Sequence, residues 1–318
     1  MVSVFFWSRR SAQRLAIPLV VSLFVLLPYL LTACGSSGST TGGGSTSTTT
    51  SLPCNNTSTS SSTPVTSSAT PTTTAPTNLI TPGTLTVGSD TTYPPQEFID
   101  TASGKAEGFD VDLITAMAQK LGLKAKIVTA NFNTIIDDLS AKRYDVVISA
   151  ISINPGRQKK ADFVPYFQSG ESLIVQKGNP MNIKCANNLC GLRAGVQDGT
   201  IELDALNATN KKCTQAGKPA IKLTVLKDQT DVIQLLVNHR VDATYQDSPV
   251  SDYYIKQNAG QFEIGGSVVN TVPEGIAVRK GDTAMLNAMQ GAFNAIKSDG
   301  TYDKLFTKWQ LNASQKIS

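Results

Sequence analysis

From Gly83 onward the chain alternates short apolar strands with amphipathic helices, and this pattern constrains the fold more than any other feature. The segment DVVISA at 145–150 is apolar almost throughout. A strand without polar alternation is buried on both faces, which requires helices on both sides of a largely parallel sheet. The sequence therefore predicts an α/β fold, with strands at 84–88, 126–128 and 145–150 and helices at 111–121 and 133–140.

The helix predicted at 111–121 has the clearest boundaries. Apolar side chains recur every three or four positions along it, as on one face of an α-helix. Asp110 is placed to accept hydrogen bonds from the first free N–H groups, and Gly122 to end the helix. We therefore expect Asp110 to be the N-cap residue.

The same alternation returns between residues 192 and 247. DVIQLL at 231–236 resembles TIIDDL at 134–139, and RVDA at 240–243 parallels RYDV at 143–146. Two similar α/β halves in one chain predict two lobes of related design. The remaining predicted elements are strands at 192–196, 221–226, 242–247 and 275–279 and helices after Thr200 and at 230–238, 284–298 and 302–309.

The first 34 residues have the composition of an export signal. Three arginines without any acid precede an apolar run at 15–31, and the sequence LTAC then ends at Cys34. LTACG resembles the bacterial lipobox, in which the cysteine is diacylated and becomes the first residue of the mature chain; two acyl chains hold a protein on a membrane. The alternative is a transmembrane helix, since the run is just long enough to span a bilayer. We expect residues 1–33 to be a signal peptide and lipidated Cys34 to anchor the protein on the extracytoplasmic face of the cell membrane.

Residues 34–82 are predicted to be a disordered tether that begins with the lipidated cysteine. Between residues 35 and 78, 27 of 44 positions are Ser or Thr and none is charged. Such a composition cannot bury enough apolar surface to offset the entropy of the chain. As a flexible coil, a segment of this length reaches about 35–40 Å, which lifts a folded body clear of a membrane.

Composition also excludes several classes of function. The formal net charge is +4, but without Arg9, Arg10 and Arg14 it falls to +1, with 25 basic and 24 acidic residues. A nearly neutral body without a basic block is not typical of a nucleic-acid-binding protein. His239 is the single histidine of the sequence, so chemistry that depends on several histidines is excluded. We expect no metal and no cofactor.

A series of motifs in the body resembles one family. The resemblance begins with DxxYxP from Asp90 and GFDVDL from Gly108, and it extends through residues 83–311 in order. The sequence of this body is similar to the family 3 extracellular solute-binding proteins, the polar amino-acid receptors of ABC importers. The later motifs are SAISINPGR at 149–157, GVQDGT at 195–200, VDA at 241–243, QDSP at 246–249, GIAV at 275–278 and DGTYDK at 299–304.

This resemblance implies a two-lobed clamshell of the periplasmic-binding-protein type (type II), each lobe a mixed, mostly parallel sheet flanked by helices. The first lobe would comprise residues 83–172 and the return segment 275–318, and residues 173–274 would form the hinge and the second lobe. The ligand would lie in the cleft between the lobes, which is also where ligands bind beside α/β sheets. Closure about the hinge would enclose it.

A free amino acid carries a carboxylate and an ammonium group, and a closed cleft must neutralise both. Arg157 can donate hydrogen bonds to both carboxylate oxygens with its planar guanidinium, and the resemblance implies an arginine at this position for this purpose. The alternative for Arg157 is a surface cation beside two lysines. The resemblance implies that backbone N–H groups near Ser152 and Ile201 assist Arg157. Thr200, at the start of a helix, adds a hydroxyl close to free N–H groups.

Asp247 is the candidate partner of the ammonium group, because it ends a strand at which a buried charge needs a partner. The resemblance implies that the Ala150 carbonyl and the Ser152 hydroxyl assist it. An N-cap role for the following helix is the alternative for Asp247.

Other positions would surround the ligand's side chain. Tyr93 and Phe132 match positions that enclose it in the family, although both could be ordinary core aromatics. Asp90 would face the side chain or the ammonium, unless it is only a cap at the end of a strand. The remaining candidates for the cleft are Ser149, Gln197 and Gln246, the last two at positions where some relatives carry charged groups.

Three residues depart from the family pattern. Gln96 stands where phenylalanine is usual, Ile201 where threonine or glycine is common, and Glu274 where tyrosine is common. These departures leave the groups for the carboxylate and the ammonium in place. They leave the identity of the ligand open.

Four cysteines remain after Cys34. An exported protein meets an oxidising compartment, so we expect disulfides. Cys190 and Cys213 flank the first strand–helix unit of the second lobe, and we predict a bridge between them. Cys185 either pairs with Cys54 or stays free.

The resulting hypothesis is a monomeric, lipid-anchored receptor, not an enzyme, that captures a polar L-amino acid for the permease of an ABC importer. One alternative is a dehydratase-type enzyme on the same fold, for which Asp90 and Asp247 are the candidate acids or bases. A second alternative is a sensor subunit that presents its ligand to a receptor kinase.

Replacing Cys34 with alanine tests the predicted anchor. We expect the Cys34→Ala protein to leave the membrane fraction or to remain unprocessed, because the acyl chains have no attachment point. Membrane partition and the mass of the mature N-terminus measure this. Unchanged membrane partition of the variant would contradict the prediction.

Overall fold

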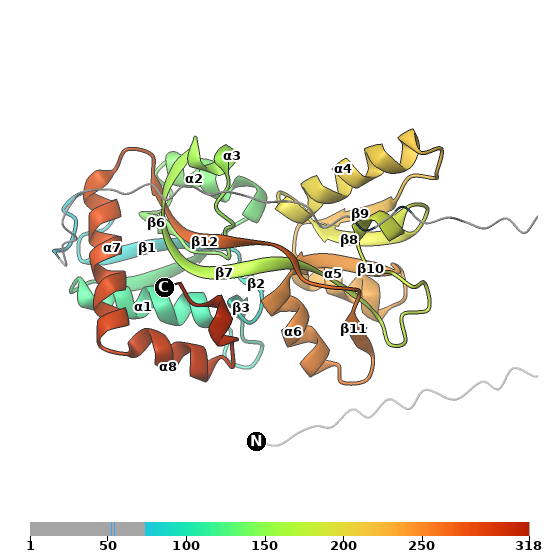
Figure 1. Cartoon of the computed structure of the whole chain (residues 1–318). Coiled ribbons are helices and arrows are strands. Elements are labelled where there is room, and N and C mark those ends of the chain that lie inside the picture. The colour runs from blue at the N-terminus through green and yellow to red at the C-terminus, as the bar shows by residue number, and fades with distance from the viewer. Residues whose placement is uncertain (1–51, 53, 55–73, 318) are drawn as a thin grey trace, which may run out of the picture. The chain divides into compact units, whose positions relative to one another are not determined.

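A computed structural model of the protein describes residues 52, 54 and 74–317, and the predicted α/β fold is confirmed (Figure 1). The signal peptide and Cys34 lie outside the described residues. The strands are β1 (Thr84–Ser89), β2 (Thr92–Tyr93), β3 (Glu97–Ile99), β4 (Ala106–Glu107), β5 (Lys124–Thr129), β6 (Val146–Val147), β7 (Ala161–Gln176), β8 (Arg193–Gln197), β9 (Lys222–Leu226), β10 (Ala243–Asp247), β11 (Phe262–Ile264) and β12 (Val269–Arg279). The α-helices are α1 (Phe109–Lys120), α2 (Ile135–Ser140), α3 (Pro155–Gln158), α4 (Ile201–Gln215), α5 (Gln229–Val237), α6 (Ser248–Gln257), α7 (Thr283–Ser298) and α8 (Thr301–Lys308).

The main sheet of the described part has the strand order β5–β1–β6–β12–β7–β10–β8–β9, and β11 pairs with β7. β1 runs parallel to β5 and β6, and β8 runs parallel to β9 and β10. These parallel groups belong to two lobes. The first lobe contains β1, β5, β6, α1, α2, α7 and α8, and the second contains β8–β10 and α4–α6.

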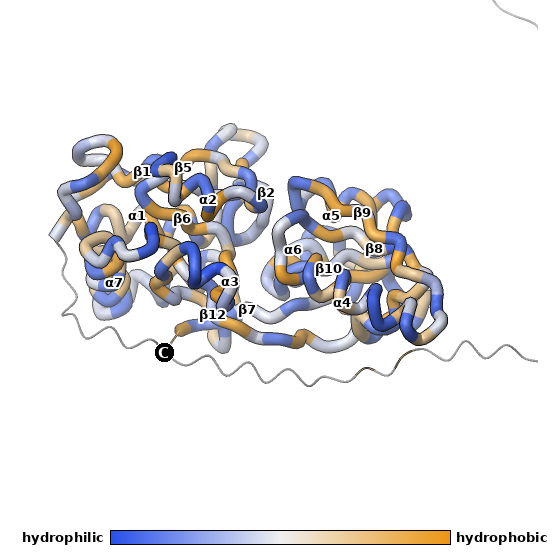
Figure 2. Tube along the Cα trace, turned by 90° about the horizontal axis from the view of Figure 1, so that it is seen from above, coloured by the Kyte–Doolittle hydropathy of each residue, from blue (hydrophilic) through white to orange (hydrophobic). Residues whose placement is uncertain are grey.

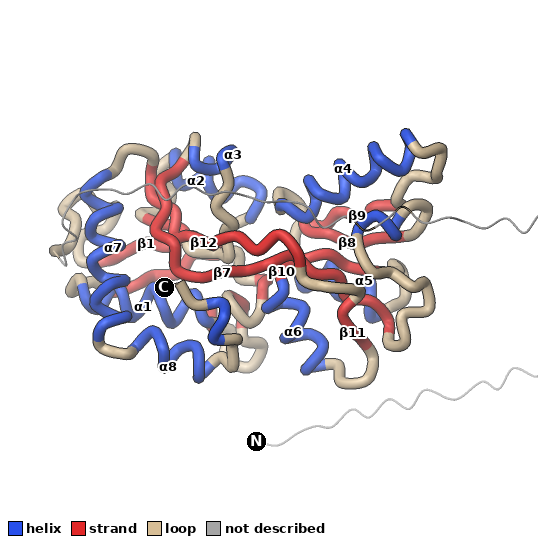
Figure 3. Tube along the Cα trace, in the orientation of Figure 1, coloured by secondary structure: helices blue, strands red, loops and turns tan. Residues whose placement is uncertain are grey.

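Two long strands connect the lobes. β7 and β12 pair antiparallel from Ala161 with Arg279 to Glu171 with Val269, and both run from one lobe into the other (Figures 1 and 3). In the second lobe, β7 continues as the partner of β10 and β11. The crossing therefore consists of a paired backbone ladder whose register shifts twice, between Val269 and Val272 and between Glu274 and Gly275.

Each lobe has its own apolar core. In the first lobe, Leu85 of β1, Leu113 of α1 and Met289 of α7 are fully buried in one cluster. In the second lobe, Val196 of β8 and Leu206 of α4 lie in a separate cluster. Figure 2 shows the contrast between buried and exposed segments, because the buried strand β6 is hydrophobic and the exposed helix α3 is hydrophilic.

Asp110 does not cap the helix that it was expected to cap. Gly108 is the N-cap residue of α1, and Asp110 lies inside the first turn with no exposed surface. Its Oδ2 accepts hydrogen bonds from the Tyr166 hydroxyl at 2.6 Å and from the Ala150 backbone N–H at 3.1 Å. The expectation was wrong because tertiary partners, unknown from the sequence, hold this carboxyl group.

Two strands also differ in length from the predictions. In DVVISA only Val146 and Val147 form ladder pairs, and the chain then turns through Ala150, which has a φ of 46°. Conversely, the strand expected at 275–279 begins at Val269, because β7 also supplies partners for Val269 and for residues 272–274.

The structure contains two disulfides among the described residues. Cys190–Cys213 confirms the prediction, and Cys54–Cys185 settles the pairing that was left open. The second bridge joins the predicted tether to the second lobe, while Ala75 and Leu79, further along the tether, pack against the core of the first lobe. No helix within the described residues combines the length and the hydrophobicity needed to cross a bilayer.

The Cys190–Cys213 bridge closes a loop of 23 residues. We expect the double variant Cys190→Ser, Cys213→Ser to lose about 3 kcal/mol of unfolding free energy in the chain-entropy model. Denaturant unfolding without reductant measures the loss. A reductant should lower the wild-type midpoint more than that of the double variant, since the variant has one bridge left. Equal midpoints for the two oxidised proteins would contradict the prediction.

Candidate functional site

A small cavity lies where side chains of the two lobes meet. Its side chains nearly fill it, and the free cavity volume is only about 10 Å³. Nine of the predicted site residues line it together with one that was not predicted, Glu202. The lining residues are Tyr93, Phe132, Ala150, Ser152 and Arg157 from the first lobe and Gln197, Thr200, Ile201, Glu202 and Asp247 from the second.

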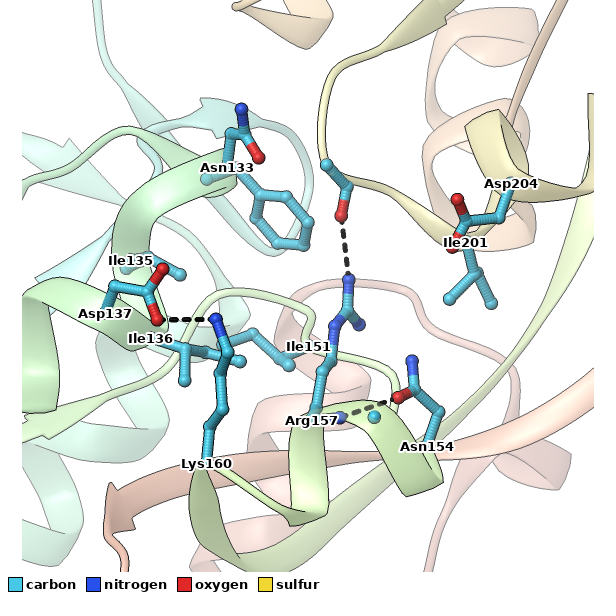
Figure 4. A pocket seen from close by; sticks show the side chains of 13 residues that line it. Asn133, Ile135, Ile136, Asp137, Ile151, Asn154, Arg157, Lys160, Ile201 and Asp204 are labelled. Atoms are coloured by element: carbon cyan, nitrogen blue, oxygen red, sulfur yellow. Dashed lines mark hydrogen bonds and ion pairs between the residues drawn. The ribbon is translucent and has the colours of Figure 1, made fainter. Parts of the chain in front are cut away.

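Arg157 reaches across the cleft from α3. The Asn154 side chain accepts from the Arg157 backbone N–H at 2.8 Å and so caps this short helix. The guanidinium donates from Nη1 to the Ser152 carbonyl at 2.8 Å. From Nη2 it donates to the Gly199 carbonyl of the second lobe at 3.1 Å (Figure 4). It also lies 5.3 Å from the centre of the Phe132 ring. Arg157 is thus a bridging group of the cleft and not a free surface cation.

The mouth of the cleft is a larger hollow of about 330 Å³ beside the same arginine (Figure 4). Lys160 lies here, and its Nζ contacts Asp137 at 2.7 Å. Ile201 and Asp204 face this hollow from the second lobe. Burial lowers the pKa of the Arg157 guanidinium, against the opposing effect of nearby carboxylates, first of all Glu202.

Asp247 ends β10 and faces the first lobe. Its Oδ2 accepts from the Tyr93 hydroxyl at 2.8 Å, and its backbone N–H donates to the same hydroxyl at 3.1 Å. Asp247 occupies the N-cap position of α6, but its side chain makes no capping hydrogen bond. Burial raises its pKa to about 6, although hydrogen bonds from Tyr93 and Ser169 oppose the shift. The carboxyl group of Asp247 therefore lies in the cleft and does not cap α6.

Asp90 lies directly behind the lining. Gln197 of the second lobe donates from Nε2 to Asp90 Oδ2 at 2.5 Å, and the Thr92 hydroxyl donates to Oδ1 at 3.0 Å. Burial raises the pKa of Asp90 to about 6, and the hydrogen bonds from Gln197 and Thr92 lower it in part. The Gln197–Asp90 hydrogen bond joins two predicted site residues from opposite lobes.

Two predicted residues support the cleft without lining it. Ser149 accepts from the Asp90 backbone N–H at 2.8 Å and donates to Glu97 at 2.9 Å, so it fixes the chain behind Asp90. Gln246 points into the second lobe, where its Nε2 donates to the Ser251 hydroxyl at 2.7 Å and the Ser172 carbonyl at 3.1 Å. The structure therefore does not bring Gln246 to the cavity.

Glu202 was missed by sequence reasoning. It lies in the first turn of α4, two residues after Thr200, and only 2% of its surface is exposed. An acid in the first turn of a helix is ordinarily a solvated partner of the helix dipole. The sequence pattern therefore does not distinguish a buried first-turn acid from an exposed one. The available signal was its spacing from Thr200, since a residue two positions after a cap in the cleft stays close to the cleft.

Gln96 and Glu274, which both differ from the residues usual in the family, contact each other in the structure. Gln96 Nε2 donates to Glu274 Oε2 at 2.5 Å, and both side chains are fully buried. Burial raises the pKa of Glu274 well above its usual value. The pair lies beneath the cleft, because Glu274 is bridged to Ser152 through the backbone. Two residues that depart from the family pattern are thus hydrogen-bonded to each other.

The part of the chain that the structure describes holds no group of three or more His, Cys, Asp or Glu side chains suited to a metal ion. The cleft instead offers one guanidinium, several carboxyl groups and two aromatic walls. Such a set can bind a small charged molecule through hydrogen bonds and ion pairs. The hydrogen bonds between the lobes show that the structure is in a closed arrangement.

Curated relatives of this chain are binding proteins. It is 32% identical to the L-cystine-binding protein TcyJ of Escherichia coli over 228 residues, which are 71% of this chain and 82% of the relative. It is also 32% identical to the lysine/arginine/ornithine-binding periplasmic protein of Escherichia coli over 236 residues, 72% of this chain and 88% of the relative.

Similar solved structures are also amino-acid-binding proteins, and they confirm the two-lobed fold. An ancestral arginine-binding protein bound to arginine is 39% identical, with a TM-score of 0.66 and coverage of 71% of this chain and 98% of that one. The ancestral amino acid-binding protein AncCDT-1, a precursor of cyclohexadienyl dehydratase, is 36% identical, with a TM-score of 0.65 and coverage of 71% and 95%. Residues 85–312 match the sequence model of the bacterial extracellular solute-binding proteins, family 3, and the chain belongs to this family.

Proposed function

We propose that this protein captures a polar L-amino acid by closure of its lobes and delivers it to the permease of an ABC importer. The observation that carries the proposal is the placement of Arg157 and Asp247, one cation and one carboxyl group, around a cavity lined from both lobes. A free amino acid brings the two complementary charges. The relatives named above bind amino acids, which supports the same class of ligand here.

The carboxylate of the ligand would bind at Arg157 and the start of α4. Thr200 is the N-cap residue of this helix, and its hydroxyl accepts from the Leu203 N–H at 3.2 Å. The first N–H groups of a helix have no partner inside it and attract an anion. One nitrogen of Arg157 now contacts the Gly199 carbonyl, and a carboxylate is the stronger acceptor.

The ammonium group would bind between Asp247, the Ala150 carbonyl and the Ser152 hydroxyl, which all lie at the cavity. The side chain would then extend between Tyr93 and Phe132 toward the polar pair Gln197 and Asp90. Gln197 Oε1 is buried without a hydrogen-bond partner, and an aliphatic side chain would leave it so, at about 1–3 kcal/mol for such a buried group. A polar side chain is therefore favoured.

The lobes would be formed by residues 83–172 with 275–318 and by residues 173–274, with the hinge where β7 and β12 cross. The paired strands support this division, since no other element of the described chain runs the length of both lobes. A lipidated Cys34 after signal peptide cleavage would hold the monomer at the outer face of the membrane. Family membership supports export.

A dehydratase-type activity is the second candidate function. The observation in its favour is that burial raises the pKa of Asp90 and of Asp247 to about 6, as for general acids and bases. Both carboxyl groups already have hydrogen-bond partners, which favours binding over catalysis. Turnover assays with cyclohexadienyl acids such as prephenate separate the two functions.

Thermal unfolding with each of the twenty amino acids tests the proposal. A ligand at 100 times its Kd adds about 2.7 kcal/mol to the unfolding free energy. We expect polar side chains of glutamine, histidine or arginine size to stabilise the protein more than leucine or valine. Arg157→Ala should weaken every ligand, whereas Asp90→Asn should mainly change the preference among side chains. Tighter binding of sugars or of dicarboxylates without an ammonium group would overturn the assignment.

Closure of the lobes gives a further prediction at Gly199. Its φ is +77°, and a Cβ there would lie 2.7 Å from the Asn133 Cα of the other lobe. We expect Gly199→Ala to weaken amino-acid binding at least about tenfold, because the methyl group holds the closed lobes apart. Gly217→Ala is the matched control, since φ is +67° there and nothing lies within 4 Å. Titration calorimetry compares the two, and equal losses would contradict a role in closure.

A further inference from the structure

The buried side chain of Glu202 carries a carboxyl group that the binding of the ligand's carboxylate and ammonium does not use. It lines the cavity beside Arg157 and Asp247. Its own backbone N–H provides one hydrogen bond, while Oε1 is buried without a partner. A buried carboxyl oxygen without a donor is unfavourable, so a donor supplied by a ligand would relieve it.

The charges around the cavity do not balance. Among the described lining residues, Arg157 is the one cation, whereas Asp247 and Glu202 are both acids. Asp90 adds a third buried acid directly behind the lining. Glu171, paired with Asp247 across β7 and β10, adds a fourth. A zwitterion with a neutral side chain brings no net charge and leaves this excess of acid unchanged.

We propose that Glu202 is a ligand-facing specificity residue that makes the closed cleft favour amino acids with a positively charged side chain. The inference rests on the proposed function and names the ligand class for the same cleft. Asp90 alone gives only a slight preference for a cation. Glu202 provides the second acid within the desolvated site.

The protonation of Glu202 links it to the charge of the ligand. Burial first, and then the neighbouring acids Asp247 and Glu171, raise its pKa well above the usual value, while Arg157 lowers it. The hydroxyl groups of Tyr93 and Tyr245 are the other titratable groups that Glu202 influences. A cationic ligand stabilises the ionised carboxylate and so causes proton release on binding. A neutral ligand of the same shape does not.

L-arginine and L-citrulline form the test pair, since they share a shape and differ in the charge of the side chain. Titration calorimetry on protein freed of ligand by unfolding and refolding gives both Kd values. We expect the wild type to bind arginine at least about 30-fold more tightly than citrulline, and Glu202→Gln to reduce this preference about tenfold. Glutamine keeps the size of the side chain and removes its charge.

Asp231→Asn is the matched control. Asp231 is an exposed acid in the first turn of α5 in the same lobe, so the variant makes the same change of charge away from the cleft. It should keep the preference within about twofold, because solvent screens an exposed charge. An unchanged preference in Glu202→Gln, or an equal loss in both variants, overturns the inference.

A measurement on the wild type keeps the inference testable should Glu202→Gln fail to fold. Binding enthalpies in two buffers with different ionisation enthalpies give the number of protons released. Arginine should release more protons than citrulline, and equal release overturns the inference. Tighter binding of citrulline or glutamine than arginine overturns it while the proposed function stands. Failure of all twenty amino acids to bind overturns both.

Discussion

The backbone ladder between β7 and β12 is the constraint on which the rest of the structure depends. It joins two lobes that have separate apolar cores, and it holds the ends of β1 and β6 opposite those of β8 and β10. The carboxyl ends of parallel strands are where side chains can leave a sheet and meet a ligand. Because only a few strands cross, the lobes can change their relative angle while each core stays intact.

The same ladder places the buried acids. The register of β7 and β12 shifts between Glu274 and Gly275, and such irregularities redirect side chains. Glu274 there meets Gln96, which comes from the first lobe. Tyr166 of β7 lies in the same layer and donates to Asp110 at 2.6 Å. The floor of the cleft is thus a set of hydrogen-bonded carboxyl groups, each with a pKa raised by burial.

A floor of this kind favours a ligand that brings positive charge. Carboxyl groups removed from water are stable only when protonated or paired. Arg157 cannot pair with all of them, because its own nitrogens contact the carbonyls of Ser152 and Gly199. Ligand charge, lobe closure and the protonation of Glu202 are therefore parts of one equilibrium. Specificity in this cleft depends on the balance of charge as much as on shape.

The sequence by itself determined the α/β fold and the two related halves, because these depend on local patterns, and most of the cleft followed from its resemblance to the family 3 solute-binding proteins. Strand and helix periods identify the elements, and Arg157, Asp247 and Tyr93 follow strand ends or turns with recognisable motifs. Only the tertiary structure decided the rest. From the sequence, Asp110 was expected to be an N-cap residue, and Glu202 has the pattern of an ordinary first-turn acid, but both are buried. Gln246 was expected in the cleft, and its partners are instead Ser172 and Ser251. The physical reason is that burial and hydrogen-bond partners arise between segments far apart in the sequence, 178 residues in the case of Gln96 and Glu274, and no local pattern carries that information.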